Sequence, residues 1–333
     1  MMVPCSFSAS AIASADLPLA VGPAMSASGG WSAEIEEETV LIARLIADPA
    51  HLSASLEKAK PRIEAAGMKL AAAEMLDFCD TTLQLDLVGG DAAVLRGVLD
   101  ECFGPCDLLV ADHEPQVPHL FVSDMDSTMI GQECIDELAD YAGLKPQIAA
   151  ITERAMQGEL DFSSALRERV LLLRGLSESA IHDCLNTRIQ PMPGAKTLVA
   201  TLKARGCHTV LVTGGFHQFA DPVAEQLGFE LVVGNRLEVG EGTLTGGLVG
   251  AITDSSVKER VLRDEAARIG ANAVSLATGD GANDIPMIAA ATYGIAYHAK
   301  PKARAAGDGW IDRGDLTDVL RLLGIPRGDW VEA

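Results

Sequence analysis

The sequence predicts an α/β protein: a Rossmann-like, doubly wound parallel sheet with a helical cap insertion, preceded by a small ferredoxin-like (βαββαβ) N-terminal domain. Three observations lead to this fold class. From residue 119 onward, short apolar segments that end in polar residues alternate with helix-like segments, which is typical of a parallel sheet. A block of helical segments follows the first of these strands directly. A β-α-β-β-α-β order precedes it.

Length and composition favour two domains and argue against several classes of protein. The chain has 333 residues, and a typical domain has roughly 150. Its hydrophobic content of 48% is sufficient for packed cores. The net charge of −21 argues against a partner that is a nucleic acid or an anionic membrane. An anionic substrate must therefore be attracted by local positive charge or by a metal ion.

The cysteines and the N-terminus indicate a cytoplasmic protein. The seven cysteines contain no CxxC pair, which favours reduced thiols. No apolar run reaches the roughly 18 residues that a membrane span requires. Residues 1–37 are rich in small residues and lack the basic start of a signal peptide, so we expect a disordered tail there.

The N-terminal domain is expected at residues 38–112. Domains with this order of elements often bind amino acids or pair edge to edge as homodimers, and an inert module is an equally weighted alternative. Two prolines make residues 113–118 the expected linker. We predict strands at 39–47, 68–76, 81–88 and 106–111. We predict one helix at 49–66 and a second that Asp91 caps and that runs to about residue 102.

The second domain is expected at residues 119–325, with a helical cap at about 132–190. Cap helices are predicted at 133–141, 146–157, 162–174 and 177–186. The predicted strands of the sheet are 120–122, 208–212, 231–233, 237–239, 273–277, 293–297 and 309–312, and the predicted helices are 194–205, 221–227 and 253–269.

Polar groups follow three of these predicted strands. Because ligands bind outside the carboxyl ends of strands in such sheets, these groups should meet at one edge. Each group alone has an ordinary interpretation, such as an acidic turn capped by Ser127 or Thr128. Their joint occurrence is more specific. The groups are the pair Asp124 and Asp126, the turn Thr213-Gly214-Gly215, and the set Asp280, Asn283 and Asp284.

This combination favours phosphoryl chemistry. Converging carboxylates form an oxygen-rich site of the kind that Mg2+ prefers, and magnesium usually takes only one or two of them. The turn at Thr213 offers a hydroxyl and backbone N–H groups to a phosphate, and Lys258 would add positive charge. The GxSxG, GxxxxGK[ST] and complete GxGxxG motifs are absent. An aspartate nucleophile that forms an acyl phosphate is the simplest chemistry left.

Four motifs of the chain resemble those of the haloacid dehalogenase-like phosphatases. They are Asp124-Met-Asp-Ser-Thr128, the Thr213-Gly-Gly-Phe turn, Lys258 and Gly279-Asp-Gly-Ala-Asn-Asp284, and the similarity covers residues 118–325. Within that superfamily the chain resembles the phosphoserine phosphatase family through Glu133, Arg169 and the segment His298-Ala-Lys-Pro-Lys302. The resemblance implies hydrolysis of O-phospho-L-serine to L-serine and phosphate through an aspartyl phosphate, with one Mg2+ per active site, as the last step of serine biosynthesis.

The resemblance also implies a role for each residue of the site. The family usually has serine where this chain has Thr213. For the reaction and the metal ion, it implies Asp124 as nucleophile and metal ligand, Asp126 as general acid/base that touches the metal through its backbone carbonyl, and Asp280 as metal ligand with Asp284 behind it. For the phosphoryl oxygens, it implies binding by Thr213, Gly214 and Lys258. For the rest of the substrate, it implies Glu133 as partner of the ammonium, Arg169 as partner of the carboxylate, and Asn283 as a neighbour.

Two other functions remain open at this stage. The first is the same chemistry on phosphothreonine, phosphohomoserine or another small phosphate. The second is a non-catalytic amino-acid sensor that uses the N-terminal domain. Without the resemblance, Glu133, Arg169 and Lys258 would be interpreted as exposed surface charges. Phe162 and Met156 would be interpreted as cap core or, alternatively, as residues that line the substrate pocket.

Overall fold

The structure is a computed structural model that describes residues 39–76, 78–79 and 81–332. The chain divides into two units, residues 1–37 and 38–333, and only the second is described below. The tail predicted at 1–37 lies outside the described residues. None of the described helices has both the length and the apolar character needed to cross a membrane.

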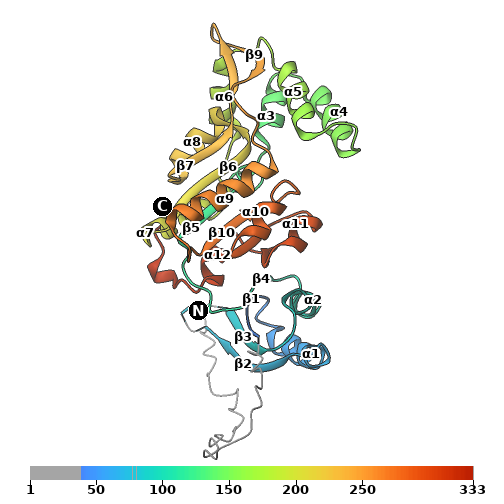
Figure 1. Cartoon of the computed structure of the whole chain (residues 1–333), viewed down its shortest axis with the longest axis vertical. Helices are drawn as coiled ribbons and strands as arrows, with labels where there is room; N and C mark the ends of the chain where they lie inside the picture. Colours follow the sequence, from blue (N-terminus) through green and yellow to red (C-terminus); the bar gives the residue numbers. More distant parts are fainter. Residues whose placement is uncertain (1–38, 77, 80, 333) are drawn as a thin grey trace, which may run out of the picture. The chain divides into compact units, whose positions relative to one another are not determined.

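Six parallel strands form the centre of the second unit (Figure 1). Successive residues of a strand point to opposite faces, and both faces here are apolar. Phe121 packs into one hydrophobic cluster, whereas Leu120 and Val122 pack into another. The predicted α/β class with a parallel sheet is therefore confirmed. The strand order is β12 (Gly309–Ile311), β11 (Tyr293–Tyr297), β10 (Ser275–Gly279), β5 (Leu120–Ser123), β6 (His208–Phe216) and β7 (Leu231–Asn235).

Helices cover both faces of these strands. Leu198 and Phe219 belong to the cluster that contains Phe121, and Leu262 and Met287 belong to the cluster on the other face. The sheet is thus doubly wound. The helices outside the cap are α7 (Ala195–Ala204), α8 (His217–Leu227), α9 (Ser255–Ile269), α10 (Ile285–Ala290), α11 (Pro301–Ala306), α12 (Thr317–Leu322) and the short 3-10 helix η1 (Arg327–Asp329).

The N-terminal segment continues the same sheet. Its strands are antiparallel in the order β2-β3-β1-β4, and β4 pairs antiparallel with β12 to give ten strands in all. Trp310 of β12 belongs to the hydrophobic cluster of this segment. Its interpretation as a separate ferredoxin-like domain, and the other predicted domain bounds, stay predictions. The elements are β1 (Val40–Ile46), α1 (Leu52–Ala65), β2 (Lys69–Met75), β3 (Thr82–Val88), α2 (Ala92–Phe103), which Asp91 caps as expected, and β4 (Asp107–Ala111).

The predicted cap helices are present between β5 and α7. The two chain segments that join them to the sheet run side by side. Ile130 forms an isolated bridge with Pro191, and the Met192 N–H donates to the carbonyl of Met129 at 2.9 Å. The cap helices are therefore attached through a short two-stranded connection. They are α3 (Cys134–Tyr141), α4 (Lys145–Met156), α5 (Phe162–Leu172) and α6 (Glu178–Arg188).

Several boundaries differ from the prediction. Thr213–Phe216 extends β6 instead of forming a turn, and α8 begins at His217 rather than at residue 221. The expected Gly-rich turn after residue 239 is a hairpin of β8 (Leu237–Gly240) and β9 (Thr243–Leu248). Its two-residue loop, Glu241 and Gly242, has positive φ at both positions, as the preferred hairpin turn requires. Helices α10, α11 and α12 were not predicted, because each has only six residues.

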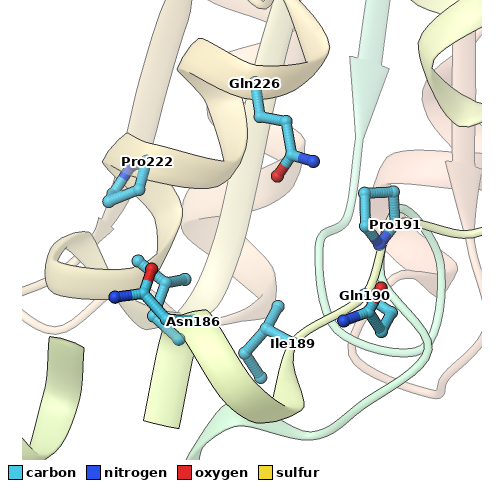
Figure 2. Close-up of a pocket in the computed structure, with 7 residues that line it drawn as sticks. Asn186, Ile189, Gln190, Pro191, Pro222 and Gln226 are labelled. Carbon is cyan, nitrogen blue, oxygen red and sulfur yellow. The ribbon is translucent and has the colours of Figure 1, made fainter. Parts of the chain in front are cut away.

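A cleft of about 300 Å3 lies between the end of α6 and α8 (Figure 2). Three side-chain amides line it, those of Asn186, Gln190 and Gln226, together with Pro191 and Pro222. None of its lining residues belongs to the site predicted from the sequence.

Candidate active site

The ends of three neighbouring strands position the predicted residues. Strand β5 lies between β6 and β10, and Ser123 is in register with both Leu211 and Thr278. The N–H of Asp124 donates to the carbonyl of Thr278 at 3.0 Å. Beneath it, the Thr278 hydroxyl donates to that of Ser123 at 2.8 Å. Asp124, Thr213 and Asp280 therefore leave the sheet at the same edge, as the sequence predicts.

Asp124 is a buried carboxylate that two donors hold. Its Oδ1 accepts from the N–H of Met125 at 2.7 Å and lies 2.7 Å from Nζ of Lys258. Among the described residues, Oδ2 has no hydrogen-bond partner. Burial, followed by the neighbouring charge of Asp284, raises the pKa of Asp124 well above its usual value, and Lys258 acts against that rise.

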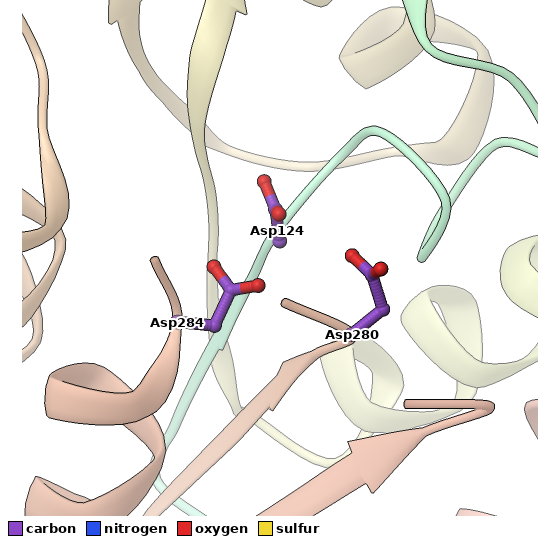
Figure 3. A group of neighbouring side chains, drawn as sticks. All are labelled: Asp124, Asp280 and Asp284. Carbon is purple, nitrogen blue, oxygen red and sulfur yellow. The ribbon is translucent and has the colours of Figure 1, made fainter. Parts of the chain in front are cut away.

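Three carboxyl groups meet at this point (Figure 3). One oxygen each from Asp124, Asp280 and Asp284 lies within 4.8 Å of the others, and all three residues are buried. Burial also raises the pKa of Asp280. A bound dication would lower the free energy of this concentration of negative charge, and carboxylate oxygens are the ligands that Mg2+ prefers. The residues present thus fit the magnesium ion that the resemblance implies.

Asp284 is held more tightly than the other two. Its Oδ1 accepts from Lys258 at 2.7 Å and from the Asn283 amide at 3.3 Å, and its Oδ2 accepts from the Gly281 N–H at 3.0 Å. Both oxygens therefore already have donors. This arrangement suits a residue that orients its neighbours better than one that binds the metal ion itself.

Lys258 is buried, with 1% of its side chain exposed, so its alternative interpretation as a surface lysine is wrong. Asp254 caps α9 and places Lys258 in the first turn of that helix. Its ammonium lies 2.7 Å from an oxygen of both Asp124 and Asp284. Burial alone would lower the pKa of Lys258, but the two carboxylates raise it above the usual value, so the group stays charged.

Asp126 lies beside this cluster, and its carboxylate is not among the three that meet. Its Oδ1 accepts from the N–H of Cys134, the first residue of α3, at 3.3 Å. Burial, followed by the charge of Glu133, raises the pKa of Asp126 to about 7. A carboxyl group with this pKa can both donate and accept a proton near neutral pH.

The end of β6 lies against the same groups. The hydroxyl of Thr213 accepts from the Gly215 N–H at 2.8 Å. A Cβ atom at Gly215 would lie 3.0 Å from Oδ2 of Asp126, and one at Gly214 would lie 3.3 Å from the ring of Phe162. Glycine at both positions therefore permits close approach. Phe162 is 39% exposed and faces Gly214, so its interpretation as cap core is wrong.

The two residues expected to bind the substrate's amino-acid part belong to cap helices. Glu133 is exposed at the start of α3, where its Oε1 accepts from the Ser127 hydroxyl at 2.8 Å. Arg169 of α5 is half-buried and has no ion pair among the described residues. Burial lowers the pKa of Arg169, against the opposing charges of Asp136 and Glu133. Arg169 thus remains available for an added carboxylate.

Comparisons with known proteins show the family of this chain. The profile of the family described as haloacid dehalogenase-like hydrolase matches residues 121–289, about half of the chain. Phosphoserine phosphatase from Streptococcus thermophilus is 46% identical over 209 residues, which are 62% of this chain and 97% of that protein. The chain belongs to the haloacid dehalogenase-like hydrolase family.

Two further relatives of this hydrolase align with it over different shares of their own length. Phosphoserine phosphatase SerB2 of Mycobacterium tuberculosis is 44% identical over 211 residues, 63% of this chain but only 51% of that protein. The crystal structure of a probable phosphoserine phosphatase from Vibrio cholerae aligns over 87% of this chain and 88% of that one, with 31% identity and a TM-score of 0.66.

Three contacts of this haloacid dehalogenase-like hydrolase could not be predicted from the sequence. Ser127, which holds Glu133, has a positive φ of 55°, rare outside glycine. The backbone N–H of Cys134 donates to Oδ1 of Asp126 at 3.3 Å. Lys300 lies with its Nζ 3.7 Å from Oδ2 of Asp280. Lys300 belongs to the segment 298–302 on which the family resemblance rests, and it stands directly before Pro301, where a helix begins; neither feature indicates the contact with Asp280.

Proposed function

We propose that this hydrolase cleaves O-phospho-L-serine to L-serine and inorganic phosphate through a phosphorylated Asp124. One observation carries the proposal. Asp124 is buried, its Oδ1 is held by Lys258 and the Met125 N–H, and its Oδ2 is left without a donor among the described residues. An oriented carboxylate with one uncommitted oxygen suits in-line attack on phosphorus.

The reaction has two halves. In the first, an oxygen of Asp124 bonds to phosphorus, the bond from phosphorus to the serine oxygen breaks, and protonated Asp126 gives its proton to that oxygen. In the second, Asp126 takes a proton from a water molecule, whose oxygen bonds to phosphorus as the Asp124–phosphorus bond breaks. The pKa of about 7 for Asp126 supports both tasks.

Positive charge and N–H groups would hold the transferring phosphoryl group. Lys258 remains charged between Asp124 and Asp284, so its ammonium would lie beside the phosphorus that Asp124 attacks. The Thr213 hydroxyl and the backbone of Gly214 would bind phosphoryl oxygens. The methyl group of Thr213, where the family usually has serine, would narrow this part of the pocket.

One Mg2+ per site is part of the proposal. Asp124 and Asp280 would hold it through their carboxylates and Asp126 through its backbone carbonyl, with Asp284 behind them. When bound, the ion supplies positive charge to the phosphoryl oxygens. The cluster of carboxylate oxygens within 4.8 Å, to which Asp124 and Asp280 belong, supports these two ligands.

The cap would select the amino-acid part of the substrate. Glu133 would bind the ammonium and Arg169 the carboxylate, with Asn283 close to both. Arg169 supports this role because it is half-buried and has no ion pair in the described part of the chain. A phosphate ester without a carboxylate would leave Arg169 unpaired, which should lower its rate of hydrolysis.

In the cell, this activity would complete serine biosynthesis in the cytoplasm. The proposed partner is a small molecule, with neither nucleic acid nor membrane involved, and a homodimer is the proposed assembly. The charge of −21 supports the exclusion of polyanionic partners.

The test is a phosphate-release assay with a panel of phosphomonoesters. We expect phosphoserine to be hydrolysed in the presence of Mg2+, loss of activity with a chelator, and recovery when Mg2+ is restored. Asp124→Asn should remain folded and inactive. Phosphothreonine, phosphohomoserine and p-nitrophenyl phosphate belong in the same panel. Equal rates for p-nitrophenyl phosphate and phosphoserine would contradict selection by the cap, and no hydrolysis of phosphoserine would contradict the proposed substrate.

A further inference from the structure

Lys300 is an exposed cation at the edge of the carboxylate cluster. Its Nζ lies 3.7 Å from Oδ2 of Asp280, and 73% of its side chain is exposed. Burial raises the pKa of Asp280, and Lys300 is the largest charge that acts against this rise. The other lysine at the cluster, Lys258, is buried and already placed between Asp124 and Asp284. The exposed ammonium of Lys300 is therefore a second cation at the cluster, and it pairs with Asp280.

The backbone of Lys300 is anchored, although its side chain is exposed. Its N–H donates to the carbonyl of Asp280 at 2.9 Å. Two residues earlier, the His298 N–H donates to the carbonyl of Ile311 at 2.8 Å, and Nε2 of His298 lies 3.0 Å from the carbonyl of Gly314. The backbone of Lys300 is thus fixed beside Asp280, while its flexible four-carbon side chain can turn to another partner.

A substrate dianion needs such a partner. The chain carries a net charge of −21, which repels phosphate esters over the whole surface. Locally, Asp284 and Glu133 add their negative charge to that of Asp280. A mobile exposed ammonium next to the metal ligands would offset this repulsion where the phosphoryl group must arrive.

We propose that Lys300 recruits the substrate: it pairs with Asp280 before the metal ion binds, and it turns to the phosphoryl oxygens once the ion occupies Asp280. This inference rests on the proposed function. Two cations beside one carboxylate repel each other, so an ion at Asp280 would weaken the Lys300–Asp280 pair. Unlike the buried Lys258 beside Asp124, the exposed Lys300 side chain is free to move away. The displaced ammonium is then free beside the phosphorus that Asp124 attacks.

Competition of this kind can be measured without turnover. We expect Lys300→Gln to bind Mg2+ about twofold to fivefold more tightly than the wild type by calorimetry without substrate, the size of effect typical of one exposed ion pair. Lys302→Gln is the matched control: Lys302 is also exposed, lies two residues further along and has no ion pair among the described residues. Lys300→Arg keeps the charge and should resemble the wild type.

The second readout is substrate capture. With saturating Mg2+, Lys300→Gln should raise KM for phosphoserine about twofold to fivefold and weaken the salt dependence of kcat/KM, because a steering charge is lost. Lys302→Gln should change neither. Circular dichroism melts of all variants check that folding is intact.

The outcomes separate this inference from the proposed function. If Lys300→Gln matches Lys302→Gln in Mg2+ affinity, or binds Mg2+ more weakly, competition at Asp280 is refuted. If Mg2+ affinity rises but KM for phosphoserine is unchanged, recruitment of the substrate is refuted. If the wild type does not hydrolyse phosphoserine at all, the proposed function fails, and the calorimetry still decides the Lys300–Asp280 competition.

Discussion

At the scale of single residues, one buried ammonium group offsets part of the buried negative charge. Lys258 contacts both Asp124 and Asp284, and all three side chains are at most 5% exposed. Isolated buried carboxylates are strongly destabilising, and the ion pair with Lys258 offsets part of the cost of burying Asp124. A carboxylate in this state is an oriented nucleophile with little competing solvent.

Replacing Lys258 by alanine should therefore affect both activity and stability. Loss of one charge-stabilising donor typically costs about 2.7–4 kcal/mol in the transition state, so kcat should fall roughly 10²–10³-fold. Leaving Asp124 and Asp284 without their cation should lower the free energy of unfolding by about 3–5 kcal/mol. Steady-state kinetics and urea denaturation measure the two effects. Lys302→Ala, an exposed control, should change neither. Near-normal turnover in Lys258→Ala would contradict the assigned role.

The protonation of Asp126 should set the alkaline side of the pH profile. The pKa of Asp126 is raised to about 7, chiefly by burial and next by Glu133. The first half of the reaction needs the protonated form, so kcat/KM for phosphoserine should fall about tenfold per pH unit above that pKa. In Asp126→Asn, the fall of kcat/KM at alkaline pH should disappear, and the rate should be about 10²–10⁴-fold lower than in the wild type. A wild-type profile that stays flat to pH 9 would exclude Asp126 as the acid.

The sequence revealed most of the chemical groups of this site but not their contacts. Asp124 and Asp280 follow apolar strands, and parallel strands meet at one edge, so their convergence is predictable. The burial of Lys258 is not, because it depends on how α9 packs against the sheet. The contacts that Cys134 makes with Asp126 and Lys300 makes with Asp280 likewise involve backbone N–H groups, whose directions depend on how the loops fold.

At the scale of elements, the β8–β9 hairpin holds the cap. The Gly175 N–H donates to the carbonyl of Leu244 at 2.8 Å, and the Leu244 N–H donates to the carbonyl of Leu176 at 2.8 Å. Ser177 and Thr243 also form an isolated bridge. The hairpin therefore adds a backbone connection between the cap and the rest of the chain, beyond the one at Ile130 and Pro191.

A comparison of two glycines tests this packing. Gly246 and Gly250 both have positive φ, 84° and 82°. A Cβ at Gly246 would lie 3.1 Å from Cβ of Arg174 and 3.2 Å from Leu171, whereas one at Gly250 would meet nothing within 4 Å. Both alanine variants should lose about 1 kcal/mol of unfolding free energy through backbone strain, and Gly246→Ala about 1–2 kcal/mol more through overpacking. If thermal denaturation gives equal losses of unfolding free energy for the two variants, the contact between Gly246 and α5 is not tight.

The elements most accessible from the sequence were the long ones. Residues 52–65 and 255–269 show helical spacing over several turns, and the apolar runs at 120–123 and 293–297 are bounded by polar residues. Strand β8 was predicted at 237–239, but its partner β9 was missed because glycines such as Gly246 and Gly247 resemble a loop. Thr213–Phe216 was expected as a turn for the same reason, yet it continues β6, and Phe216 pairs with Asn235 of β7 after an irregularity in the register.

At the scale of the whole described unit, the N-terminal segment from β1 to β4 and the part from β5 onward share one sheet and a set of charged contacts. Arg304 of α11 donates to both carboxylate oxygens of Asp100 in α2, at 2.8 and 3.0 Å. Its Nε donates to Asp312 at 2.8 Å, and its guanidinium lies 3.7 Å from the centre of the Trp310 ring. Helix α11 follows Lys300 directly, so this contact also supports the edge of the active site.

Lysine cannot replace Arg304 in that arrangement, because an ammonium cannot bind two carboxylates in a fork and stack on a ring at once. Arg304→Lys should lower the free energy of unfolding by about 1–3 kcal/mol, the range for lost hydrogen bonds to charged groups. Arg263→Lys, which alters an exposed pair with Glu259 within α9, should cost less than about 0.5 kcal/mol. Guanidinium denaturation measures both, and indistinguishable values would mean that the junction contributes little.

The account depends most on covalent phosphorylation of Asp124, and that event can be observed directly. Acid-quenched enzyme from a reaction with phosphoserine and Mg2+, reduced with borohydride and digested, should yield a peptide in which residue 124 has become homoserine by mass spectrometry. Asp124→Asn should yield none. A reduced residue elsewhere, or continued turnover without any reduced residue, would contradict the account.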